Sequence, residues 1–193
     1  NVQDVEKIAE WLDTKQVKKA AVIGGGFIGV EVMENLVEKG LQVSLIDMAP
    51  QVMMPFDHDM AQFLHKEIVD HGVELILGDG LHSIQEDGVT LQSGKKVAAE
   101  AVIMAIGVLP EVKLAKEAGL AIGETGGILV DRRMRTSDPS IYAVGDAVEL
   151  THFQTGQKTK LALAGPALRQ ARVAANSEND MAEMVPDVVG SSA

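Results

Sequence analysis

The chain has no cysteine among its 193 residues, and this absence excludes a disulfide, a thiolate metal site and a cysteine nucleophile within it. It is also poor in aromatic residues, with one tryptophan, one tyrosine and four phenylalanines. Its net charge is −11 at pH 7. A nucleic-acid-binding surface, which needs basic residues and aromatic side chains for stacking, is therefore not expected. The same acidity argues against binding to an anionic membrane surface.

Long apolar runs are missing as well. No segment approaches the length needed to cross a bilayer, and no signal peptide is visible, so a cytoplasmic location follows by default. With 46% hydrophobic residues, the chain can form one ample core or two small ones. Because it begins at Asn1 without a methionine, we expect it to be a piece of a longer protein.

A glycine-rich stretch, residues 20–29, is the most informative feature of the sequence. Residues 19–23 are typical of a buried strand, and a helix is expected to begin near Phe27. Gly24, Gly26 and Gly29 occupy the three glycine positions of the G-x-G-x-x-G pattern. The first permits a tight turn, the second lets the backbone approach a pyrophosphate, and the third lets the helix pack close to the strand. The helix N-terminus then offers free N–H groups and a positive dipole end to the phosphates.

A second apolar strand, residues 42–46, follows this helix and ends on Asp47, at the spacing expected for the acid that binds an adenosine ribose. Its carboxylate would accept hydrogen bonds from both ribose hydroxyls and repel a 2′-phosphate. No Lys or Arg lies between Asp47 and Lys66, so NAD is favoured over NADP. The alternative is a structural βαβ unit that binds no nucleotide.

The remaining pattern up to residue 110 fits a Rossmann-like α/β fold of three layers. Apolar residues at helical spacing predict helices over residues 2–15 and 57–71. A short strand at 73–77 precedes three segments around Ser83, Val89 and Val97, which are separated by hairpin turn signals. They predict an antiparallel meander in place of a crossover helix, before an apolar strand at 101–106 returns to the parallel sheet. We therefore predict a dinucleotide-binding domain over residues 1–110, with 1–17 as its leading helix.

The pattern changes after residue 110. A short helix is predicted at 114–118, strands at 128–130 and 141–144, and a helix at 165–176. The last seventeen residues, 177–193, are acidic and then small and polar, which is typical of a poorly packed tail.

Three ordered motifs, at residues 24–29, 105–107 and 142–146, carry a resemblance to the pyridine nucleotide–disulfide oxidoreductases. The chain is most similar to the branch of coenzyme A–disulfide reductases, NADH oxidases and NADH peroxidases, over residues 1–176. The resemblance implies that 1–110 binds NADH and that 111–176 is the returning segment of an FAD-binding domain, with 177–193 a tail of unknown role. It also implies small-molecule cofactors, with FAD held in the intact parent, and a homodimeric parent. The family's redox cysteine, dimerisation domain and second glycine motif are not found in this sequence.

The resemblance also assigns roles in the NADH site. Phe27 corresponds to a ring that lies over the flavin and swings aside for nicotinamide, although it could be a hydrophobic staple at the helix start. Glu31 resembles the acid that meets the nicotinamide carboxamide, or it is a glutamate that favours the helix dipole. Ile28 lies between them, and Gly107 ends the apolar strand at the ligand-binding edge, unless it is a turn glycine. Ala162 resembles a position whose backbone contacts nicotinamide.

Two residues are assigned to FAD. Asp146 resembles the acid that accepts a hydrogen bond from a flavin ribitol hydroxyl, with a helix or turn cap as the alternative. Ala164 resembles a position whose backbone contacts the flavin, and the helix from Gly165 would direct its N-terminus at the flavin.

The histidines at 58, 65 and 71 are too far apart along one helix to bind a single metal, so we interpret them as solvated helix positions. Three functions remain open from sequence. The first is part of an enzyme in which NADH reduces FAD, and the FAD then reduces a disulfide, a peroxide or oxygen. The second is a non-catalytic nucleotide-binding module, and the third is part of a ferredoxin-reductase-type flavoprotein. The oxidised substrate cannot be identified from these residues.

Overall fold

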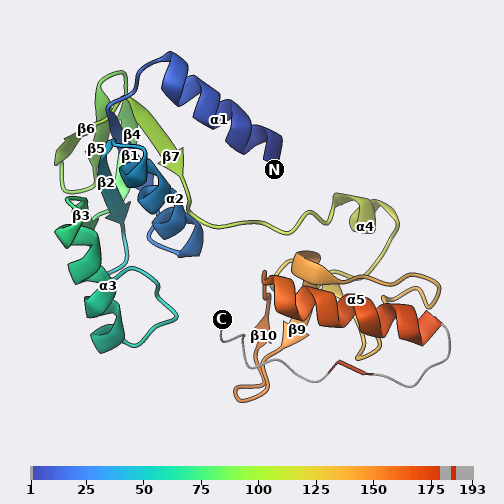
Figure 1. Ribbon diagram of the computed structural model, residues 1–193. Helices are drawn as coiled ribbons and strands as arrows, with labels where there is room; N and C mark the ends of the chain where they lie inside the picture. The colour runs from blue at the N-terminus through green and yellow to red at the C-terminus, as the bar shows by residue number, and fades with distance from the viewer. Residues whose placement is uncertain (1, 179–183, 186–193) are drawn as a thin grey trace. The chain divides into compact units, whose positions relative to one another are not determined.

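The computed structural model describes residues 2–178, 184 and 185. The chain divides into two units, Asn1–Gly107 and Val108–Ala193 (Figure 1). Each unit is described by itself.

The first unit is built on a parallel sheet of four strands in the order β3-β2-β1-β7 (Figure 1). The strands are β1 (Lys19–Ile23), β2 (Gln42–Asp47), β3 (Glu74–Leu77) and β7 (Ala101–Met104). In register, Ile23 pairs with Ile46 on one side and with Met104 on the other. The carboxyl ends of the strands therefore meet at one edge of the sheet, which is where open α/β folds bind ligands.

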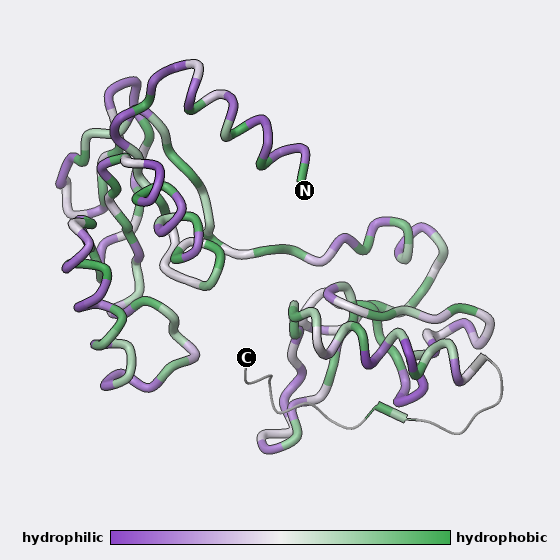
Figure 2. Tube along the Cα trace, in the orientation of Figure 1, coloured by the Kyte–Doolittle hydropathy of each residue, from purple (hydrophilic) through white to green (hydrophobic). Residues whose placement is uncertain are grey.

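Helices α2 (Phe27–Glu38) and α3 (His58–Asp70) cover one face of this sheet, and the leading helix α1 (Val2–Thr14) adds Leu12 to the core on that face. Side chains alternate along each strand, so Ala20 and Val22 of β1 point to this helical face. They join Met33 and Leu36 of α2 and Ile68 of α3 in one core. Hydrophilic and hydrophobic residues alternate along α1, as its predicted amphipathic character requires (Figure 2).

The opposite face is covered by an antiparallel meander of β4 (Leu81–Gln85), β5 (Gly88–Leu91) and β6 (Lys96–Ala98). Ala21 and Ile23 point to this side and pack with Val89, Leu91 and Val97. Helices, parallel sheet and meander make three layers, so the predicted Rossmann-like fold is confirmed.

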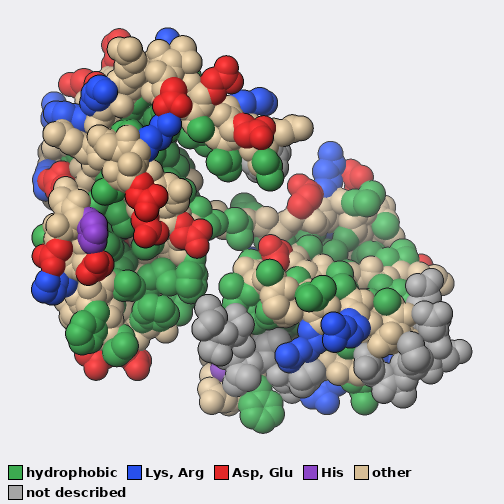
Figure 3. All heavy atoms as spheres, in the orientation of Figure 1, with side chains coloured by type: hydrophobic (Ala, Val, Ile, Leu, Met, Phe, Trp, Pro, Cys, Tyr) green, Lys and Arg blue, Asp and Glu red, His purple; other side chains and the backbone are tan. Residues whose placement is uncertain are grey.

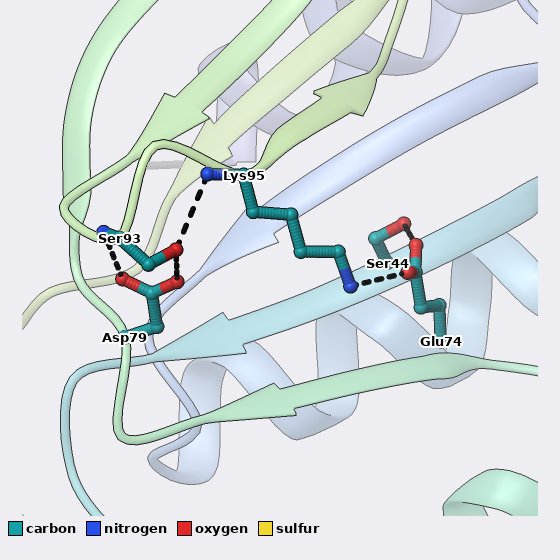
Figure 4. A network of polar contacts seen from close by, with 5 residues as sticks. All are labelled: Ser44, Glu74, Asp79, Ser93 and Lys95. Carbon is teal, nitrogen blue, oxygen red and sulfur yellow. Dashed lines mark hydrogen bonds and ion pairs between the residues drawn. The ribbon is translucent and has the colours of Figure 1, made fainter.

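A polar network joins the meander to the edge of the parallel sheet (Figure 4). The Glu74 carboxylate accepts hydrogen bonds from the Ser44 hydroxyl and from the Lys95 ammonium, each at 2.9 Å. Asp79 accepts hydrogen bonds from the Ser93 backbone N–H and hydroxyl. The bond from Lys95, then that from Ser44, lowers the pKa of Glu74, so this carboxylate stays charged and the network intact near neutral pH.

The second unit holds a small sheet in the order β10-β9-β8 and two helices, with a 3-10 turn between them. The elements are α4 (Lys113–Glu117), β8 (Ile128–Leu129), η1 (Gly145–Ala147), β9 (Val148–Thr151), β10 (Lys158–Thr159) and α5 (Ala164–Glu178). The buried Glu149 carboxylate accepts hydrogen bonds from the backbone N–H and hydroxyl of Thr125, both at 2.8 Å, and so fixes the turn before β8.

The structure corrects several predicted elements. β7 ends at Met104, two residues early, because its partner β1 ends at Ile23, the residue paired with Met104. The strand predicted at 141–144 is wrong: only an isolated bridge joins Tyr142 to Arg135. Strands β9 and β10 were not predicted, because short strands among polar residues carry no clear period.

The predicted tail is also partly wrong. Ser177 and Glu178 belong to α5, and Val185 is buried against Met134 and Val173. Met184 is exposed. The rest of the predicted tail, 179–183 and 186–193, lies outside the described residues.

Replacing Gly29 by Ala should destabilise the first unit. A β-carbon at Gly29 would lie 1.8 Å from the Gly24 carbonyl oxygen, so α2 would have to move away from β1. We expect a loss of about 3 kcal/mol in the free energy of unfolding, measured by urea denaturation. Gly26→Ala is the matched control, because a β-carbon there meets no atom within 4 Å. Equal stability of the two variants would contradict the close packing of α2.

Candidate dinucleotide-binding site

The glycine turn lies between β1 and α2, and each predicted glycine has a different physical reason. Gly24 has φ +109°, and a β-carbon there would lie 2.3 Å from the Ala105 carbonyl oxygen of the strand-β7 extension. Gly29 packs α2 onto the turn itself. Gly26 is exposed and has open space beside its α-carbon. The geometry therefore agrees with a tight turn, a close helix and one open position for a ligand.

Helix α2 starts at this turn without a side-chain cap. Gly26 is its N-cap residue, and the first helical bond runs from the Val30 N–H to the Gly26 carbonyl at 3.0 Å. The N–H groups of the first turn thus have no acceptor within the helix, and they form the positive end of its dipole. Phe27 and Ile28, which flank this end, are 52% and 54% exposed. An uncapped, exposed helix start of this kind binds anions such as a pyrophosphate.

Asp47 lies beside the turn at the end of β2 and holds it in place. One carboxylate oxygen accepts a hydrogen bond from the Gly25 N–H at 2.5 Å, and the other accepts one from the Ala49 N–H at 2.8 Å. The sequence pattern predicts this carboxylate only as a partner of the ribose, and its bonds to Gly25 and Ala49 are seen only in the structure. Each carboxylate oxygen can accept a further bond, and Asp47 is only half-buried, so a ribose diol can still reach it.

The segment after β2 braces the same turn from another side. The Met53 N–H donates to the Gly25 carbonyl at 2.8 Å, and the neighbouring Val52 N–H donates to Nε2 of His65 at 3.1 Å. The interpretation of His65 as a solvated position is therefore wrong. Burial, and to a smaller extent the nearby His58, lowers the pKa of His65, which is consistent with a neutral ring that accepts a hydrogen bond.

The other residues predicted for NADH lie in two places. Glu31 is exposed on α2, one turn beyond Phe27. Gly107 is exposed with φ +109° and follows Ala105, the residue that contacts Gly24. Ala162 is exposed and belongs to the second unit. The first unit thus brings together the glycine turn, Asp47 and the end of β7.

The second unit brings its two FAD candidates to helix α5. Asp146 is exposed in η1, and the preceding Gly145 N–H donates to Oε1 of Gln170 on α5 at 2.7 Å. Ala164 is the exposed first residue of the same helix. Gln170 is only 1% exposed, and its Nε2 has no hydrogen-bond partner among the described residues. Gln170 was not predicted from the sequence, although its spacing of three from the buried Val173 places it on the same helix face.

Exposed hydrophobic side chains gather over α3 and the loop that precedes it (Figure 3). They include Met54, Phe56, Met60 and Phe63, which are 43% to 70% exposed. A group of this kind, unlike single scattered residues, marks a surface where a ligand or another surface packs.

The described residues contain neither a metal cluster nor a membrane-spanning helix. Within residues 2–178 and 184–185, no group of three or more His, Asp or Glu could hold a metal ion. No helix in the described part of the chain combines the length and apolar character that crossing a membrane requires.

These features define a Rossmann-like α/β protein with an open glycine turn at the carboxyl edge of its parallel sheet. Residues 1–171 match the family model described as pyridine nucleotide-disulphide oxidoreductase, and the chain belongs to this family. The resemblance found in the sequence is thereby confirmed.

Known relatives agree with this assignment. The chain is 40% identical to an NADH oxidase of Methanocaldococcus jannaschii, over 90% of this chain and 39% of that protein. It is 32% identical to a coenzyme A disulfide reductase of Staphylococcus haemolyticus, over 91% of this chain and 40% of that protein. Among solved structures, reduced Bacillus anthracis CoADR-RHD superimposes with a TM-score of 0.93 at 45% identity, covering 97% of this chain and 34% of that one. The chain therefore spans about two fifths of the length of these curated relatives.

Replacing Gly26 by Ala should separate binding from folding. Its backbone, with φ −79° and ψ −173°, is open to any residue, so we expect the stability to change by less than about 0.5 kcal/mol. The added methyl group would occupy the open position at the helix start, and the affinity for NADH should fall by about tenfold or more, which costs about 1.4 kcal/mol. Fluorescence titration with NADH measures this, and undiminished affinity would place the pyrophosphate elsewhere.

Proposed function

We propose that the first unit binds NADH and that the second unit supplies part of an FAD site, so that the whole protein passes hydride from NADH to FAD. The flavin would then reduce a disulfide, a peroxide or oxygen, in the cytoplasm and as a homodimer. The observation that carries the NADH assignment is the open Gly26 beside the uncapped start of α2. Membership of the family and the names of the relatives support the same reading.

In this proposal, the chain binds and orients NADH through groups at the glycine turn, on α2 and at the strand ends. The N–H groups at the start of α2 bind the pyrophosphate, and Asp47 binds the adenosine ribose through the acceptor capacity left on its carboxylate. Phe27 has an exposed ring at the helix start, where it can cover the flavin and move aside for nicotinamide. Glu31, one turn further along, faces solvent and is available to the carboxamide. Gly107, exposed at the end of the same unit, would present its backbone to the ligand.

The second unit offers a partial flavin site. Asp146 would accept a hydrogen bond from a ribitol hydroxyl, and the Gln170 amide holds the turn on which Asp146 lies. Ala164 begins a helix of fifteen residues, whose positive end would stabilise negative charge on reduced flavin. The hydride chemistry itself is supplied by the two cofactors when they are bound, and the protein supplies their positions.

Asp47 should give preference for NADH over NADPH. Like charges about 4 Å apart with intermediate screening repel by roughly 4 kcal/mol, and even a third of this gives about tenfold discrimination. Asp47→Ser should weaken NADH binding and narrow the gap between the two dissociation constants. Asp47→Asn is the control, because it keeps one acceptor oxygen for Gly25 while removing the charge. Equal dissociation constants for NADH and NADPH in the unmodified chain would contradict a ribose contact by Asp47.

The chain as printed should bind NADH but retain little FAD. It carries one glycine turn of the G-x-G-x-x-G type, which the proposal uses for NADH, so nothing comparable holds the flavin pyrophosphate. After gel filtration, the absorption spectrum should lack stoichiometric flavin bands, and no NADH-dependent disulfide reduction should be seen. A yellow protein with one FAD per chain would refute this expectation.

A further inference from the structure

A short loop, residues 51–56, packs against the glycine turn, and we call it the bracing loop. Its Met53 N–H donates to the Gly25 carbonyl at 2.8 Å, while Asp47 accepts from the N–H of the same glycine at 2.5 Å. A β-carbon on Gly25 would also lie only 3.0 Å from the Val52 side chain. Gly25 is therefore held through both of its backbone polar groups, and the bracing loop provides one of the two.

The bracing loop keeps an unusual backbone conformation. Met53 has φ +50°, in the left-handed region that residues with a β-carbon rarely adopt, and it is 6% exposed. Such a residue persists only where surrounding contacts fix it, and such residues cluster at functional sites. The Gln51 amide donates to the Phe56 carbonyl at 2.8 Å, and the Phe56 N–H donates back to Met53.

A side chain outside the loop, His65 on α3, also holds it. Its Nε2 accepts the hydrogen bond of the Val52 N–H, and the Val52 residue is 0% exposed. Loss of this acceptor would therefore leave a buried N–H without its partner, which is costly. His65 is the only side chain of the described residues that is recorded as bonding to the backbone of Val52 or Met53.

We propose that His65 is a positioning residue for the dinucleotide site, and that its protonation weakens dinucleotide binding. The neutral ring holds Val52, the adjacent Met53 holds Gly25, and the glycine turn keeps the shape in which Gly26 and the start of α2 meet the pyrophosphate. This inference rests on the proposed NADH site. It adds a residue that touches neither the cofactor nor the glycine turn.

The sign of the effect follows from the hydrogen bond. A protonated imidazole carries N–H groups on both nitrogens, so it cannot accept from Val52. Burial and His58 keep the pKa of His65 below its ordinary value of 6.5. The contribution of the neutral ring is thus fully present above pH 6.5 and is lost as pH falls through the lower pKa of the folded protein. By linkage, bound dinucleotide should lower the pKa of His65 further.

The charged groups around His65 leave this assignment simple. The bracing loop has no ionisable side chain. On α3, His58 acts on His65, and its Nδ1 lies 3.0 Å from Oε1 of Gln51, whereas Lys66 pairs with Asp70. Strand β3, against which α3 packs, carries Glu74, which is paired with Lys95. Asp47, beyond the loop, is bonded to Gly25 and Ala49.

The test is the pH profile of NAD⁺ affinity, from about pH 8 to about pH 5.5, by calorimetry on the chain as printed. NAD⁺ is the probe because it is stable in acid. The unmodified chain should lose affinity by several-fold, up to about tenfold, over this range, as a buried hydrogen bond is broken. His65→Gln, whose amide oxygen can accept from Val52 and does not titrate, should keep the affinity seen at high pH throughout. His65→Leu should bind weakly at every pH.

His71→Gln is the matched control, since His71 is the residue that follows α3 and its side chain is 63% exposed, and it should show the profile of the unmodified chain. His58→Gln should move the midpoint to higher pH, because the neighbouring charge is gone. A His65→Gln profile that still falls like that of the unmodified chain would overturn the proposal. If His65→Leu does not fold, the His65→Gln profile decides.

Failure of the proposed function is distinguishable. If the unmodified chain binds no NAD⁺ at any pH, the NADH assignment falls, and the coupling is tested by NMR instead. Protonation of His65 should shift the Gly25 and Met53 amide signals in the unmodified chain and in His71→Gln, but not in His65→Gln. Absence of these shifts in the unmodified chain would overturn the coupling itself.

Discussion

The hydrogen bond between the Gly25 N–H and the Asp47 carboxylate is the contact on which the candidate site depends. It joins the turn after β1 to the end of β2, and it fixes where the open position at Gly26 lies relative to the carboxylate that would bind the ribose. The Met53 N–H donates to the Gly25 carbonyl, so both polar groups of the Gly25 backbone are hydrogen-bonded. A loop so constrained is preorganised, and preorganisation reduces the conformational cost of binding a ligand.

The three-layer arrangement explains why these contacts meet at one edge. Parallel strands in register bring their carboxyl ends together. The turn after β1 therefore lies beside Asp47, the last residue of β2, and beside Ala105, the residue after β7. Helices and meander bury the two faces, so the edge is the part of the sheet left for a ligand. The network of Glu74, Ser44 and Lys95 ties the meander to the strand next to β2 and so supports the end of β2 indirectly.

The second unit uses the same device in a different form. An exposed acid, Asp146, lies on a turn whose backbone is held by a buried amide, Gln170, just as Asp47 and the bracing loop hold Gly25. In both units, a side chain distant in sequence accepts a hydrogen bond from the backbone of a turn glycine. Nε2 of Gln170 is a buried donor without a partner among the described residues, and such groups usually have an acceptor.

The sequence by itself determined the three-layer fold, the limits of β1 and β2 and the start of α2, because glycine positions and apolar periodicity are local signals. It also selected Gly24, Gly26, Gly29 and Asp47 as a group, since the spacing of a βαβ unit fixes which strand ends become neighbours. Only the tertiary structure decided what His65, Met53 and Gln170 do, and that the segment at 141–144 forms a bridge rather than a strand. Their partners are backbone groups distant in sequence or held in irregular loops, and no periodic pattern records which N–H a side chain will meet once the layers have packed.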